Sequence, residues 1–176
     1  MNAPTFLILA IFLCLFLPFS SQINAESDLI KQVCSQTTNP SLCTTTLVSN
    51  PKAASATNFV TLCKAALVSV IINAIDLLSY VDNALFNDPK PELKEALETC
   101  VKQYNYAKGS LESSYMEIDL DPLTANYDAK VAGDGYTYCE EALARTKVGD
   151  PKLSAKNKVG LDFVSIADSA TSKLPN

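Results

Sequence analysis

The chain has 176 residues, 48% of them hydrophobic, and this length and composition predict one domain with its own core. Acidic residues outnumber basic ones by 19 to 14, and the net charge of −5 argues against nucleic acid or an anionic membrane as a partner. The sequence contains no histidine, which excludes enzymes built on Ser-His or Cys-His pairs and on His-ligated metals.

The first predicted element is a secretory signal peptide over residues 1–25. An unbroken apolar run extends from Phe6 to Leu17, and cleavage after the small residue Ala25 would follow. The run is too short to cross a bilayer, since a spanning helix needs roughly 20 apolar residues. Cleavage would leave residues 26–176 as one mature domain with no membrane association. An uncleaved anchor is the alternative, because no Lys or Arg precedes the run.

Residues 26–50 are predicted to form a helical hairpin. The segment "SDLIKQVC" offers Ser27 as an N-cap, "PSLCTTTLV" begins with proline, and "TTNP" between them favours a turn. A bridge between Cys34 and Cys43 would clamp the two halves, which are too short to hold helical structure alone. The hairpin either packs only against the rest of the domain or mediates homodimerisation.

Residues 54–174 are predicted to form an up-and-down bundle of four helices. Apolar residues recur at steps of three and four in four segments, over 63–84, 93–111, 122–145 and 159–170. "NDPKPE" and "KVGDPKLS" contain the prolines and the glycine that separate helices. Gly133 and Gly135 weaken the third segment by about 1 kcal/mol each, unless backbones approach closely there. No segment has the alternating pattern of a strand, so we predict an all-α fold.

Five cysteines remain once the signal peptide is removed, so at most two disulfides form and one thiol stays free. The count alone does not choose among the possible pairings. Cys63 lies in a long apolar helical pattern, where a free cysteine behaves as a small buried hydrophobe, and we predict that it is the unpaired one. Pairing Cys34 with Cys43 then leaves Cys100 with Cys139, on the inward stripes of the second and third bundle helices.

No pattern typical of a catalytic or metal site is present. Acidic pairs occur at Asp119 and Asp121 and at Glu140 and Glu141, but carboxylates at helix ends are usually ordinary surface groups. Calcium-loop, phosphate-loop and zinc-site patterns are missing, so we predict no metal, no cofactor and no enzymatic activity. We expect the bundle to act by binding. One basic group is a candidate for binding a polyanion, although a solvated face is the better interpretation: Lys147, Lys152, Lys156 and Lys158.

Several motifs together resemble the plant invertase and pectin methylesterase inhibitor family. They are "LIKQVCSQTTNPSLC", the turn "SNPKAAS", "LKEALETCVKQYNYAKGSL" and "AGDGYTYCEEAL", with four cysteines in order along the whole mature chain. The most specific parts are "NPSLC", the spacing of Cys100, Tyr104 and Ala107, and the pair Cys139-Glu140. The resemblance implies a disulfide-closed hairpin, a four-helix bundle bridged between its second and third helices, and an inhibitor in the apoplast.

The family contains inhibitors of two unrelated enzymes on one scaffold, so the resemblance leaves the target open. Its invertase inhibitors typically carry Pro-Lys-Phe on the third bundle helix, and the corresponding residues here are Pro122, Leu123 and Thr124. The missing lysine and aromatic ring count against invertase as the target. "GDPKL" is similar to that motif, but it follows Cys139, and we expect it to begin the last helix.

The leading hypothesis is a secreted inhibitor that forms a non-covalent 1:1 complex with pectin methylesterase and covers its active-site cleft. One alternative is inhibition of a cell-wall invertase, or of a vacuolar invertase with the vacuole as its location. The other is a non-inhibitory secreted protein with a structural or ligand-storing role. Candidate target contacts are outward residues of the second and third bundle helices: Lys102, Asn105, Lys108, Pro122, Leu123, Thr124, Tyr127 and Asp128.

Overall fold

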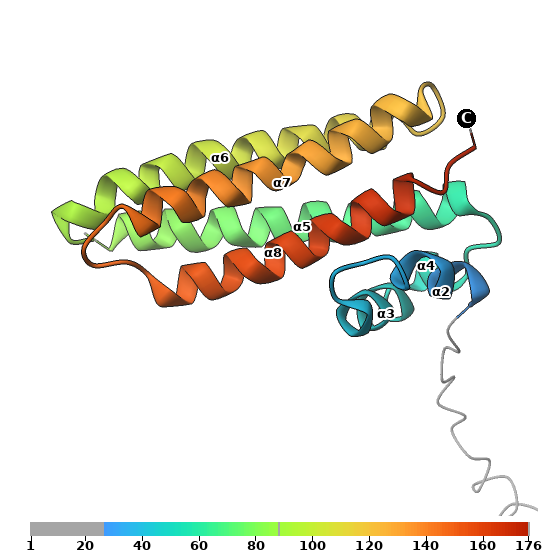
Figure 1. The fold of residues 1–176 in the computed structure, drawn as a ribbon, viewed down its shortest axis with the longest axis horizontal. Helices are drawn as coiled ribbons and strands as arrows, with labels where there is room; N and C mark the ends of the chain where they lie inside the picture. Colours follow the sequence, from blue (N-terminus) through green and yellow to red (C-terminus); the bar gives the residue numbers. More distant parts are fainter. Residues whose placement is uncertain (1–26, 88, 176) are drawn as a thin grey trace, which may run out of the picture.

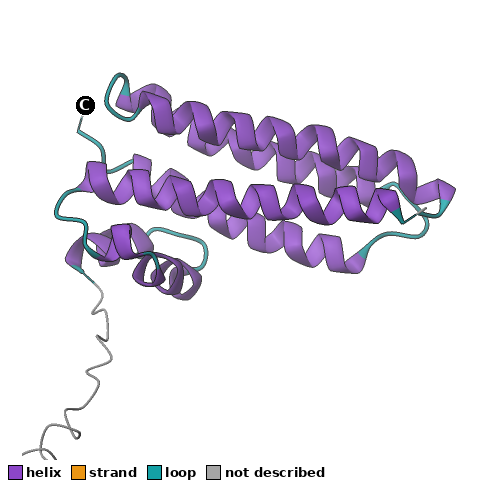
Figure 2. Ribbon diagram, turned by 180° about the vertical axis from the view of Figure 1, so that it is seen from behind, coloured by secondary structure: helices purple, strands orange, loops and turns teal. Residues whose placement is uncertain are grey.

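The computed structural model describes residues 27–87 and 89–175, and every regular element within these ranges is an α-helix (Figure 1, Figure 2). The predicted all-α fold is therefore confirmed. The predicted signal peptide, residues 1–25, lies outside the described residues. The helices are α2 (Asp28–Cys34), α3 (Pro40–Ser49), α4 (Pro51–Ala54), α5 (Phe59–Phe86), α6 (Pro91–Glu117), α7 (Pro122–Ala144) and α8 (Pro151–Thr171).

Helices α5 to α8 form the predicted up-and-down bundle. In Figure 1 the chain runs along α5, returns along α6 and reverses twice more through α7 and α8. Each bundle helix contacts the next one in the chain, and α8 closes the ring by contacting α5. The four helices therefore enclose one core, and α6 and α7 lie side by side as one layer of it.

Capping side chains fix where three of the bundle helices begin. Asn58, Asp121 and Asp150 accept hydrogen bonds from backbone N–H groups three residues further on, at 2.9, 3.1 and 3.0 Å. Prolines begin α6, α7 and α8. The first residue of a helix has no intrahelical acceptor for its N–H, so a proline costs no hydrogen bond there. Gly149 has a φ of 60° and turns the chain into α8, so "GDPKL" begins the last helix as predicted.

Helix α7 runs without a break through Gly133 and Gly135. A Cβ at position 135 would overlap the carbonyl oxygen of Gln103 and press on Ala107, both on α6. Gly135 therefore allows the backbones of α6 and α7 to approach closely. The sequence left two interpretations of these glycines, a weak helix or a close approach of two backbones. The structure shows the close approach.

The hairpin of α2 and α3 packs against α5 and α8. Its turn is held by Asp162 of α8, whose carboxylate accepts hydrogen bonds from the Thr38 hydroxyl at 2.7 Å and the Asn39 amide at 3.0 Å. Residues 51–54, expected within a turn, instead form the single-turn helix α4. Asn50 stabilises that turn, because its side-chain oxygen accepts hydrogen bonds from the backbone N–H groups of Lys52 and Ala53.

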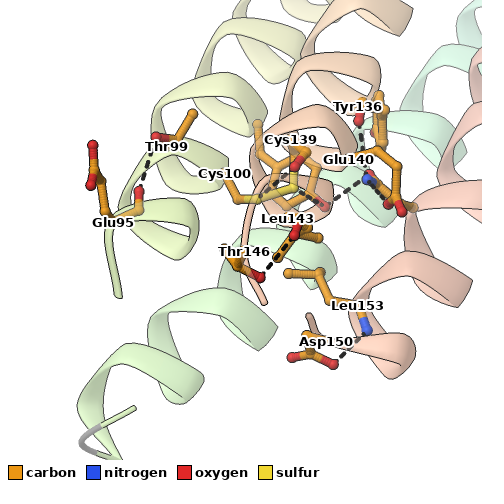
Figure 3. The surroundings of a disulfide bond; sticks show 12 residues. Glu95, Thr99, Cys100, Tyr136, Cys139, Glu140, Leu143, Thr146, Asp150 and Leu153 are labelled. Carbon is orange, nitrogen blue, oxygen red and sulfur yellow. Dashed lines mark hydrogen bonds between the residues drawn. A yellow bond between two sulfur atoms is a disulfide. The ribbon is translucent and has the colours of Figure 1, made fainter. Parts of the chain in front are cut away.

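Both disulfides of the predicted fold are present. Cys34 and Cys43 join α2 to α3 across a Cα–Cα distance of 5.4 Å. Cys100 and Cys139 join α6 to α7 (Figure 3), and their Cα atoms lie 4.5 Å apart. Cys63 is free and fully buried in the core. The first bridge closes the hairpin, whereas the second fastens two bundle helices to each other.

Candidate functional site

The outer face of α6 and α7 rests on the most closely joined helix pair of the bundle. Besides the disulfide and the close approach at Gly135, the buried Ser114 hydroxyl of α6 donates to the Ala125 carbonyl oxygen of α7 at 2.7 Å. The hairpin packs against α5 and α8, so this face is left open to solvent (Figure 1). Side chains on it are therefore presented by a rigid support, which lowers the entropy lost on binding.

A shallow groove of about 420 Å³ lies on this face between the two helices. Tyr106 of α6 and Tyr127 of α7 lie along it with 49% and 65% of their surface exposed. Gly109 leaves open space beside them, since a Cβ there would meet no atom within 4 Å. The groove is lined by Asn105, Tyr106, Gly109, Ser110, Ser113, Tyr127, Asp128 and Val131.

This combination is suited to protein recognition. Exposed tyrosines provide a large contact area with few rotatable bonds and a hydroxyl for hydrogen bonding, and they are enriched among residues that dominate binding energy. The serines and glycine between them leave room for side chains of a partner. The arrangement therefore supports binding.

Three of the predicted contact residues, Asn105, Tyr127 and Asp128, line the groove together. Lys102 is exposed on the same helix as Asn105, one turn earlier. Lys108 lies elsewhere: it forms an ion pair with Glu112 at 2.9 Å. Residues two apart on a helix point roughly 200° apart, so Lys108 and Tyr106 project from opposite flanks of α6.

The residues matching the invertase motif occupy the first turn of α7. Pro122 is half-buried and Leu123 is 66% exposed. Thr124 is exposed, but its backbone N–H and hydroxyl both donate to Asp121, at 3.1 and 2.8 Å. These bonds hold the pKa of the Asp121 carboxyl below its usual value. Thr124 therefore takes part in capping α7.

Sequence reasoning missed Tyr106, Gly109, Ser110, Ser113 and Val131 as members of the groove. On α6 they recur at steps of three and four, a period that marks one side of a helix. That pattern was available in the sequence. However, this spacing identifies an outward side of α6 only when the opposite side is known to be buried. It also does not show which residues of α7 lie beside that side.

A buried polar network lies beneath this face, and Figure 3 labels Tyr136 and Glu140 among its members. The Tyr104 hydroxyl of α6 donates to the Asn157 side chain of α8 at 2.9 Å. The Asn157 amide donates to the Tyr136 carbonyl oxygen at 3.0 Å and to the Glu140 carboxylate at 2.9 Å, both on α7. Burial raises the pKa of Tyr104 and keeps its phenol neutral. The network ties three helices together, which gives it a structural role.

Three of the four acidic residues considered as catalytic candidates also have structural partners. Asp119 pairs with Lys64, Asp121 caps α7, and Glu140 accepts from Asn157. Within residues 27–87 and 89–175, no group of three or more Cys, Asp or Glu residues is arranged to hold a metal ion.

The family assignment follows from comparison with known proteins. Residues 28–169 match the family model described as plant invertase/pectin methylesterase inhibitor. The chain belongs to this family. The resemblance inferred from the cysteine order and "NPSLC" is therefore confirmed. Membership also confirms that the protein is an inhibitor and not an enzyme, directed at pectin methylesterase or invertase.

Individual relatives agree with this assignment. Pectinesterase inhibitor 2 of Arabidopsis thaliana is 29% identical over 86% of this chain and 86% of its own length. Pectinesterase inhibitor 1 of the same species is 28% identical over 93% of this chain and 92% of its own. The crystal structure of a mutant form of a pectin methylesterase inhibitor from Arabidopsis superposes with a TM-score of 0.74 at 26% identity, covering 85% of this chain and 99% of that one.

Proposed function

We propose that this protein inhibits pectin methylesterase by covering the active-site cleft of the enzyme with the outer face of α6 and α7, in a non-covalent 1:1 complex. The observation that carries the proposal is the groove between these helices, with Tyr106 and Tyr127 exposed along it on a disulfide-joined support. The relatives named above, which are pectinesterase inhibitors, support pectin methylesterase as the target.

The start of α7 argues against invertase. Where the invertase inhibitors of the family carry lysine and phenylalanine, this chain has an aliphatic Leu123 and a Thr124 whose hydroxyl is bonded to Asp121. Neither residue supplies a positive charge or an aromatic anchor. Because a few such anchors dominate the binding energy of an interface, their absence removes the contact on which that mode of inhibition depends.

Titration of the mature chain against both enzymes tests the target. We expect near-stoichiometric inhibition of pectin methylesterase and none of invertase. Tyr106→Ala and Tyr127→Ala should each weaken inhibition about thirtyfold or more, because truncating a hot-spot residue costs about 2 kcal/mol or more. Inhibition of invertase alone would overturn the proposal.

Two control variants separate this face from the rest of α6. Tyr115 is also exposed on α6, but it lies nine positions after Tyr106, so the two rings point to opposite sides of the helix. Tyr115→Ala and Lys108→Ala should leave inhibition within about twofold of the wild type. If they weaken it as much as Tyr106→Ala does, the interface lies on another face.

Location and oligomeric state belong to the same proposal. Removal of residues 1–25 would release the chain to the apoplast, where the proposed target lies; the vacuole would apply only to a vacuolar invertase. Pairing of two molecules through the hairpin stays a prediction, which sedimentation velocity of the free protein tests. A single species with the mass of one chain would contradict it.

A further inference from the structure

A second groove, of about 650 Å³, lies where α4 meets α5 and α6. Its volume falls within the roughly 300 to 1,000 Å³ typical of small-molecule sites. Tyr115 contributes to it from the flank of α6 that points away from Tyr106, so it is separate from the proposed enzyme-binding face. It is also a surface groove and lies outside the bundle core. It is lined by Asn50, Pro51, Lys52, Ser55, Val60, Thr61, Lys64, Ala65, Val68 and Tyr115.

The exposed wall of this groove is largely apolar, and exposed apolar residues of α5 extend from its edge. Val68 is 41% exposed, and Ile72 and Ile75 follow it at steps of four and three, also exposed. Residues at this spacing share one side of a helix, so they form a linear apolar strip. By length and composition α5 is apolar enough to span a bilayer, but its inward stripe is buried in the bundle, whereas Val68, Ile72 and Ile75 are exposed.

Two lysines provide the charge at this groove. Lys52 forms no ion pair with any residue in the described part of the chain. Lys64 pairs with Asp119, and both side chains are partly exposed. Asn50 is already satisfied, because its amide donates to the Ala65 carbonyl oxygen and the Ser69 hydroxyl. The Lys52 ammonium is therefore unpaired, and the Lys64 ammonium has three donors, of which Asp119 takes one. Together the two groups favour an anion.

We propose that this groove binds a free medium-chain fatty acid, with its carboxylate at Lys52 and Lys64 and its alkyl chain along Val68 toward Ile75. Lys64 and Ile75 lie about 16 Å apart along α5 at 1.5 Å per residue, which suits an extended chain of about twelve carbons. A linear apolar strip that begins at two cations matches such an amphiphile in both shape and charge. A second copy of this chain fits less well, since each copy carries a net charge of −5.

Calorimetric titration of the mature protein with dodecanoate, kept below its micelle concentration, tests the proposal. We expect one site per chain. Lys52→Gln and Lys64→Gln should each weaken binding about threefold to tenfold, because each removes one cation from a partly exposed site. Asp119→Asn should strengthen it, because Lys64 loses a competing carboxylate. Lys94→Gln, at an exposed position on α6 outside the groove, should change nothing.

The apolar strip has its own matched pair of variants. Val68→Asp should weaken dodecanoate binding more than tenfold, because it places a carboxylate beside the alkyl chain. Val159→Asp on α8, where the valine is 42% exposed compared with 41% for Val68, should have no effect. Circular dichroism checks that both fold. If Val68→Asp does not fold, the lysine variants and Asp119→Asn decide the question.

Three results would overturn the proposal: no dodecanoate binding, equal binding of dodecyltrimethylammonium, or lysine variants that bind as the wild type does. A strip covered by a second copy would show as a dimer that Val68→Asp dissociates, which also contradicts it. Inhibition of pectin methylesterase is measured separately with and without dodecanoate. We expect no change, so a failure of either proposal leaves the other standing.

Discussion

At the scale of single residues, Gly135 sets the distance between α6 and α7. Its lack of a Cβ leaves space for the Gln103 carbonyl oxygen, and so the disulfide, the Ser114 bond and the tyrosine groove all depend on the same close approach. Sequence reasoning treated this glycine first as a weakness, because helix propensity describes an isolated helix. Because α6 packs directly against it, Gly135 stabilises the folded protein.

Gly135→Ala should destabilise the protein by about 1–3 kcal/mol, since the added methyl has to displace backbone. Gly109→Ala is the matched control. It meets no atom within 4 Å, and we expect it to stabilise α6 by about 0.5–1 kcal/mol through lower backbone entropy in the unfolded chain. Urea unfolding followed by circular dichroism measures both. Equal effects of the two substitutions would show that α6 and α7 are not in backbone contact at this point.

At the scale of elements, the two disulfides act on different parts of the fold. Cys34 and Cys43 are separated by 9 positions in the sequence and close the hairpin, whereas Cys100 and Cys139 are separated by 39 and fasten two long helices. In the chain-entropy account, closing a longer loop constrains the unfolded chain more. The hairpin also has other attachments, such as the bonds from its turn to Asp162.

Replacing Cys100 and Cys139 together with alanine should lower the free energy of unfolding by about 2–5 kcal/mol. Replacing Cys34 and Cys43 should lower it less and should instead increase hydrogen exchange in α2 and α3, because short helices depend on being held together. Urea unfolding and exchange followed by mass spectrometry distinguish the two outcomes. The assignment of roles fails if the hairpin variant loses as much global stability as the bundle variant.

At the scale of the whole molecule, the core holds three acidic protons away from solvent. Burial raises the pKa of Cys63 to about 12 and also raises the pKa values of Tyr104 and Tyr136. In the unfolded chain these groups deprotonate near their ordinary values of 9.0 for cysteine and 10.0 for tyrosine. Above about pH 9 the unfolded state therefore binds fewer protons than the folded state.

Stability should accordingly be unaffected by these groups below pH 9 and should fall as the pH rises from 9 toward 12. The loss should reach a few kcal/mol, at about 1.4 kcal/mol for each unit of difference between folded and unfolded pKa. Urea midpoints measured across this range test the effect. In Cys63→Ala the decline should begin about one unit higher, where tyrosine deprotonates. A midpoint independent of pH up to 11 would mean that these protons are not protected.

The sequence by itself determined the fold class, the order of the helices and the identity of the free thiol. Apolar spacing marked the inward side of each bundle helix, and prolines marked where α7 and α8 begin. These features depend on residues that are close together in the chain, so they can be predicted from a single sequence. The short helix α4 was missed because its 4 residues span a single turn, in which no apolar spacing can repeat.

Only the tertiary structure decided which outward residues meet. Helical periodicity places Asn105, Tyr106 and Lys102 outward, but it does not say which part of α7 lies beside them. That register is set by the disulfide and by Gly135, and it brings Tyr106 and Tyr127 to one groove while Lys108 projects from the other flank. Only some of the predicted contact residues therefore lie together in one site. The local sequence shows which side of a helix faces outward, but it does not show how two helices pair.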